Sequence, residues 1–107
     1  MESRKDIIIS GGGIAGLAAA VAFGTAGFEV LCVDPTAPVI DRSNQGADLR
    51  TTAYLQPAHA FLQQIGLWPL LAERSAPLQI MRIVDAARET LVRKDFNAAD
   101  ISNAPFG

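Results

Sequence analysis

Three glycines near the start of the chain, Gly11, Gly13 and Gly16, have the GxGxxG spacing of a phosphate-binding turn. In such a turn the first glycine permits a tight bend, and the second lets the backbone approach a pyrophosphate. The third lets a helix pack closely on a strand. The chemistry that this spacing predicts is the binding of a dinucleotide through its phosphate groups.

An acidic residue stands where a ribose-binding carboxylate is expected. Asp34 follows Gly16 by 18 residues, close to the roughly 20 residues that separate turn and acid in dinucleotide-binding units. Its carboxylate would accept hydrogen bonds from the hydroxyls of an adenosine ribose. The same negative charge would repel a 2′-phosphate, so Asp34 disfavours an NADP site at this turn.

Two apolar runs on either side of the glycines predict strands. Ile7–Ile9 is a β-branched run, typical of a parallel strand that is buried on both faces. Residues 28–33 form a second apolar run, which ends at Asp34. These strands and the segment between them predict a Rossmann-like βαβ unit and an α/β fold class.

The segment between the two runs predicts a helix from Ile14 to about Ala26. It is rich in alanine, contains neither proline nor charge, and is followed by Gly27, a suitable helix stop. The unpaired N–H groups and the dipole of a helix N-terminus attract anions. We therefore count Ile14 and Ala15 with the glycines as predicted cofactor-binding residues.

The same region has a second interpretation. Arg4 and Lys5 precede a run without charge, residues 7–28, which is long enough for a signal peptide or a membrane helix. Three adjacent glycines interrupt that run near its start. Each glycine costs about 1 kcal/mol in a helix interior, so the sequence favours the nucleotide-binding unit.

Beyond Asp34 the pattern changes. Residues 35–48 hold prolines and other turn-forming residues, and they predict a long irregular loop. A helix is expected from Pro57 to Ile65, and a short helical turn over residues 70–74. A simple NAD dehydrogenase would more often continue with a helix and a parallel strand, so the loop favours another branch of nucleotide-binding proteins.

The last third of the chain predicts a β-hairpin. Residues 78–84 alternate in part between apolar and polar side chains, and residues 90–96 repeat an alternating pattern after a short connection. A hairpin cannot belong to a purely parallel sheet, so it indicates the start of a second, antiparallel sheet. We therefore predict two parts, residues 1–76 of a nucleotide-binding domain and residues 77–107 of a truncated substrate domain.

Length and charge narrow the function further. A doubly wound dinucleotide fold has around six strands, and a chain of 107 residues offers only part of it, so we expect a fragment. The net charge is −2, with no cluster of lysine or arginine. This composition argues against nucleic acid as a partner.

The remaining reactive side chains predict no catalytic site. Cys32 lies inside a strand, where packing is its expected role, and His59 has no neighbouring histidine or cysteine with which to bind a metal. Asp41, Asp48 and Asp85 are expected to be solvated or turn carboxylates. The catalytic residues therefore stay unknown, and no metal ligands are predicted.

Four segments together resemble the N-terminal portion of aromatic-ring flavoprotein monooxygenases, and most closely the ubiquinone-biosynthesis hydroxylases. They are the GGGIAG turn, Asp48 to Ala53 (DLRTTA), Ile65 to Trp68 (IGLW) and Pro77 to Asp85. The resemblance extends over residues 6–95. The family more usually has glutamate at the position of Asp34, and its later motifs find no match before residue 107.

The resemblance implies that the glycine turn and Asp34 bind the ADP half of FAD, and that Arg50 contacts the flavin cofactor. It also implies a reaction in which NADPH or NADH reduces FAD and oxygen is used to hydroxylate a small aromatic substrate, such as a phenol. A quinone-precursor substrate would suggest peripheral membrane association of an otherwise cytoplasmic protein, at the inner face of a membrane. The oligomeric state is not predicted.

Two other functions stay open at this point. One is a fragment of an NAD-dependent dehydrogenase, which requires a regular helix and a third parallel strand after Asp34. The other is a non-catalytic nucleotide-binding module that is complete at this length.

Overall fold

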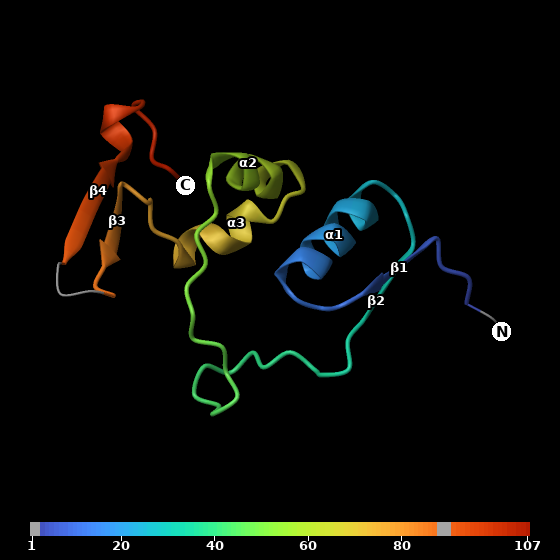
Figure 1. Cartoon of the computed structure of the whole chain (residues 1–107). Helices are drawn as coiled ribbons and strands as arrows, with labels where there is room; N and C mark the ends of the chain where they lie inside the picture. Colours follow the sequence, from blue (N-terminus) through green and yellow to red (C-terminus); the bar gives the residue numbers. More distant parts are fainter. Residues whose placement is uncertain (1–2, 88–90) are drawn as a thin grey trace. The chain divides into compact units, whose positions relative to one another are not determined.

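The structure is a computed structural model, and it describes residues 3–87 and 91–107. The fold is mixed α/β, with a strand, helix and strand followed by helices and an antiparallel sheet (Figure 1), which confirms the predicted fold class. Contacts divide the chain into two compact units, Met1–Thr51 and Thr52–Gly107. The predicted division after residue 76, into a nucleotide-binding domain and a substrate domain, stays a prediction.

The first unit contains the predicted βαβ arrangement. Strand β1 (Ile7–Ser10) and strand β2 (Val30–Val33) run parallel, with Ile7 opposite Val30 and Ser10 opposite Val33. Helix α1 (Ile14–Thr25) connects them and packs against both strands (Figure 1). The uncharged run from Ile7 to Phe28 thus forms a strand, a turn and a helix.

The prediction that β1 is buried on both faces is wrong for this chain. Ile9 is half-buried, and its Cγ2 atom lies 3.5 Å from the point where a Cβ at Gly16 of α1 would stand. Ile8, which points to the opposite face, is 68% exposed. The physical reason is that α1 covers one face of the two-stranded sheet.

Helix α1 ends in a Schellman motif centred on Gly27, as the predicted stop requires. Gly27 has φ +98°, and its N–H donates to the Gly24 carbonyl at 3.1 Å. The Phe28 N–H donates to the Phe23 carbonyl at 3.1 Å, and the two phenyl rings meet edge to face. Because Phe28 belongs to this cap, strand β2 begins at Val30, two residues later than predicted.

The segment after β2 is irregular, as predicted. Residues 34–55 form bends and turns, with neither a regular helix nor a strand. A dehydrogenase fragment would need a helix and a third parallel strand here. The described part of the chain therefore does not meet the condition set for that alternative.

The second unit begins with helices and continues into the hairpin. Its elements are α2 (Gln56–Gln64), α3 (Trp68–Leu71), η1 (Ala72–Arg74), β3 (Ile80–Asp85), β4 (Val92–Asn97) and η2 (Ala98–Asp100). Strands β3 and β4 pair antiparallel, which confirms the predicted hairpin (Figure 1). Residues 88–90, which include the first residue of the predicted second strand, lie outside the described residues.

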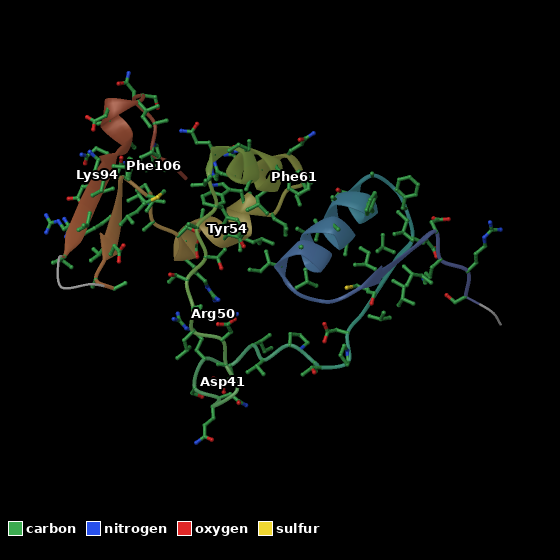
Figure 2. The ribbon with its side chains drawn as sticks, viewed as in Figure 1. Asp41, Arg50, Tyr54, Phe61, Lys94 and Phe106 are labelled. Carbon is green, nitrogen blue, oxygen red and sulfur yellow. The ribbon has the colours of Figure 1, made fainter. Side chains whose placement is uncertain are left out.

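A small set of contacts holds the second unit together. The buried apolar side chains of the described residues are Leu62, Ile65 and Ala98. The N–H of Gln56, at the start of α2, donates to the Phe106 carbonyl, and the Phe106 N–H donates to the carbonyl of Leu78, two residues before β3, each at 2.9 Å. Figure 2 shows Phe106 in the last segment of the chain.

A cross-strand ion pair lies on the hairpin. Arg82 of β3 stands directly opposite Asp95 of β4. Its Nε donates to Oδ1 at 2.7 Å and its Nη2 donates to Oδ2 at 2.9 Å, so the guanidinium and the carboxylate form a bidentate pair. These bonds lower the pKa of the Asp95 carboxyl below its usual 3.8.

None of the described helices combines the length and the apolar content that crossing a membrane requires. The longest of them, α1, has 12 residues.

We predict that Gly16→Ala destabilises the fold. A Cβ at residue 16 would collide with the Gly11 carbonyl oxygen, whereas a Cβ at Gly24 of the same helix meets no atom within 4 Å. The collision should lower the free energy of unfolding by about 1–3 kcal/mol, the usual cost of overpacking. The control, Gly24→Ala, should raise it by about 0.5–1 kcal/mol. Urea unfolding followed by circular dichroism measures both, and equal stability of the two variants would contradict the close packing at Gly16.

Candidate functional site

The glycine turn follows the end of β1, leads into α1 and is hydrogen-bonded to the end of β2. Gly11 has φ +113°, a conformation that L side chains rarely adopt. Its N–H donates to the Val33 carbonyl at 2.8 Å, which extends the pairing of the two strands by one bond. The turn therefore starts at the same edge of the sheet at which Asp34 leaves β2.

Helix α1 begins close against this turn. The Gly11 carbonyl oxygen occupies the space that a side chain at Gly16 would need. Gly13 is the N-cap residue, and its carbonyl accepts the first helical bond from Leu17 at 2.9 Å. The structure thus brings Gly11, Gly13 and Gly16 together in the way that the motif predicts.

The first turn of α1 presents backbone donors to the outside. Ile14 is 56% exposed, and Ala15 is exposed. Among the described residues, no side chain caps the N-terminus of α1 with a hydrogen bond. The first N–H groups of a helix have no partner within it. A Cβ at Gly13 would meet no protein atom within 4 Å, so the space in front of the turn is open. This arrangement suits an anion such as a pyrophosphate.

Asp34 is tied to the turn through a residue that the sequence analysis did not select. The Gly12 N–H donates to Asp34 Oδ2 at 2.9 Å, and the Thr36 N–H donates to Oδ1 at 2.8 Å. These bonds, the Gly12 bond most of all, lower the pKa of the Asp34 carboxyl below 3.8. The carboxylate is therefore charged at neutral pH and stands beside the glycine turn.

Cys32 supports the turn from the strand beneath it. Its side chain is half-buried, and its Sγ donates to the Gly11 carbonyl at 3.4 Å. The contact agrees with a packing role for this thiol.

Arg50 is held by a neighbour on its own loop. Its Nε donates to Asp48 Oδ1 at 2.9 Å, and its Nη2 donates to Oδ2 at 2.7 Å. The guanidinium lowers the pKa of the Asp48 carboxyl to about 2, and the carboxylate raises the pKa of Arg50. Figure 2 shows Arg50 and Asp41 on the long loop after β2. The predicted contact of Arg50 with a cofactor stays a prediction.

The other polar residues considered from the sequence have local partners. Asp41 Oδ1 accepts the N–H and the hydroxyl of Ser43, and Asp85 Oδ1 accepts the Ala87 N–H. His59 packs edge to face on Trp68, with ring centroids 4.1 Å apart. Within residues 3–87 and 91–107, histidine, cysteine and acidic side chains do not gather into a group that could hold a metal ion.

Sequence reasoning missed Gly12 because the motif leaves its second position unspecified. A signal was present, since the run GGG offers a residue without a side chain beside the two motif glycines. What the sequence could not give was the direction of the Gly12 N–H. The structure shows that this N–H points at the acid 22 positions further along the chain.

Comparison with known proteins supports a flavin site in this region. Residues 6–52 match a family model described as an FAD binding domain. The chain is 35% identical over 84 residues to the ubiquinone hydroxylase UbiL of Rhodospirillum rubrum, a match that covers 78% of this chain. The match covers 19% of that relative, so the chain spans about a fifth of its length. No solved structure matches significantly. These matches confirm the predicted resemblance to FAD-dependent hydroxylases.

We predict that the low pKa of Asp48 depends on Arg50. In Arg50→Gln the charged hydrogen bonds of the guanidinium are lost, so the pKa of the Asp48 carboxyl should rise from about 2 toward its ordinary 3.8, while the backbone N–H of residue 50 still holds it below that value. Arg42→Gln serves as the control on the same loop and should leave Asp48 unchanged. Carbon-13 NMR of the side-chain carboxyl, recorded against pH, measures the midpoint. A midpoint near 3.8 in the unmodified chain would contradict the pairing.

Proposed function

We propose that this chain is the FAD-binding part of a flavin-dependent monooxygenase that hydroxylates an aromatic ring, with NADPH or NADH as reductant. The observation that carries the proposal is the placement of the open glycine turn and the Asp34 carboxylate together at one edge of the β1–β2 sheet. The match of residues 6–52 to an FAD binding domain supports it.

The residues of this edge fit the ADP half of FAD. The open space at Gly13 admits a pyrophosphate close to the backbone, and the N–H groups of Ile14 and Ala15 would donate to its oxygens. Each Asp34 oxygen already accepts one backbone N–H and has acceptor capacity left for a ribose hydroxyl. The negative charge of Asp34 disfavours a 2′-phosphate.

In the proposed enzyme, bound FAD would supply the redox chemistry with oxygen, and the protein would bind, orient and shield the reactants. The glycine turn and Asp34 anchor the adenosine end, which leaves the flavin ring to be directed by other residues. The Nε and Nη2 atoms of Arg50 donate to Asp48. We propose that the remaining N–H groups of this guanidinium donate to an oxygen of the cofactor. No residue of this chain is assigned a proton-transfer role.

The similarity to a ubiquinone hydroxylase supports a hydroxylase of aromatic or quinone-like compounds as the class of enzyme. We propose a small aromatic substrate on that basis. We also propose that the enzyme contacts a membrane surface, where such apolar substrates gather.

The proposal is tested by titrating the purified chain with FAD in a calorimeter. We expect FAD and ADP to bind. FMN lacks the AMP part of FAD, including the ribose that Asp34 would bind, so it should bind at least tenfold more weakly, which is about the effect of losing one charge-assisted hydrogen bond. Gly13→Val should abolish binding, because its side chain would fill the space that the pyrophosphate needs. Its Cβ meets no protein atom, so circular dichroism should show an unchanged fold.

The other outcomes are equally specific. Binding of NADH without FAD, by a folded chain, would replace the proposal with a dehydrogenase. Equal FAD affinities of the unmodified chain and Gly13→Val would remove the glycine turn as the site.

A further inference from the structure

We propose that Gly12 is a positioning residue that holds the Asp34 carboxylate for two ribose hydroxyls, and that a side chain at position 12 weakens this function in proportion to its size. The inference rests on the proposed function, since it concerns the ribose of the same nucleotide. It assigns a role to the one glycine of the GGG run that the motif leaves unspecified.

The hydrogen bonds of Asp34 carry the first step. Two backbone donors, Gly12 N–H at 2.9 Å and Thr36 N–H at 2.8 Å, bind different oxygens of the carboxylate. A carboxylate that is gripped at both oxygens cannot rotate freely about its Cβ–Cγ bond. Its remaining acceptor sites therefore keep fixed directions before a ligand arrives, which lowers the ordering cost of binding.

The lack of a side chain at Gly12 carries the second step. A Cβ built at Gly12 would stand 3.2 Å from Asp34 Cβ and 3.6 Å from Oδ2. The first of these distances is shorter than an ordinary van der Waals contact, so the Asp34 side chain would have to move away. A shift of a few tenths of an ångström would relieve this contact, and it would weaken the hydrogen bond that Asp34 accepts from the Gly12 N–H.

The two other glycines of the run act differently. Position 11 needs glycine because its φ is +113°. At position 13 the lack of a side chain leaves open space for a ligand. Gly12 is not among the described glycines with positive φ, so alanine is compatible with its backbone. A substitution at Gly12 therefore tests the contact with Asp34 without straining the turn.

A first test needs no ligand. The Asp34 carboxyl should titrate below 3.8 in the unmodified chain, because the Gly12 and Thr36 N–H groups stabilise its charged form. In Gly12→Ala the midpoint should move toward 3.8, and in Gly12→Val further. Gly24→Ala, whose new Cβ lies in open space, should leave it unchanged. An unshifted Asp34 midpoint in both Gly12 variants would overturn the inference.

A second test uses ligands that differ by one hydroxyl. The unmodified chain should bind ADP about tenfold more tightly than 2′-deoxy-ADP, the effect of a hydrogen bond to a charged group. In Gly12→Ala we expect this ratio to fall to about threefold, and in Gly12→Val and Asp34→Asn to about one, as the hydroxyl contact weakens. Asp41→Asn, on the loop after β2, is the matched carboxylate control and should keep the ratio of the unmodified chain.

The outcomes separate the inference from the proposed function. If the unmodified chain binds FAD and ADP but the Gly12 variants weaken ADP and 2′-deoxy-ADP by equal factors, the proposed function stands and the inference is overturned. If the folded, unmodified chain binds neither FAD nor ADP, both fall. A falling ratio together with a rising Asp34 midpoint supports the inference, since general damage to the fold would not remove discrimination at a single hydroxyl.

Discussion

The close approach of helix α1 to the Gly11 carbonyl is the constraint on which the first unit depends. It is possible only because Gly16 has no side chain. A helix held further away would carry its N-terminal N–H groups out of reach of the turn. The parallel register of the strands then brings Val33, and with it Asp34, to the same edge of the sheet. Backbone packing thus assembles a donor surface and an acceptor carboxylate without a catalytic side chain.

Much of the fold could be predicted because its signals are local. The strands, the helix between them and the hairpin could be predicted from short apolar patterns, because helices and strands each place their side chains with a characteristic period. Gly27 was recognisable as a helix stop and has a positive φ in its cap, and Gly66 has a positive φ in a cap of the same kind after α2. Such residues reveal their structure because few others tolerate the conformation.

The features that could not be predicted depend on neighbours distant in the sequence or on the direction of a single group. Nothing in a linear pattern shows that the Gly12 N–H points at Asp34, or that Arg50 is gripped by Asp48. The exposure of Ile8 depends on how many layers cover the sheet. For the candidate site, residue types and spacing therefore predict the class of ligand, while the pairing of individual groups follows only from the structure.

The ion pair between Arg82 and Asp95 on the hairpin has a consequence for how the two strands find each other. A slip of one residue would place Arg82 opposite Lys94 or Phe96 and would turn every side chain of one strand to the other face. A slip of two residues in one direction would set it against Arg93, another cation. Shifts toward the start of β4 thus replace an attraction with a repulsion. The pair acts as a register mark, because the aligned hairpin keeps an attraction that every misaligned form loses.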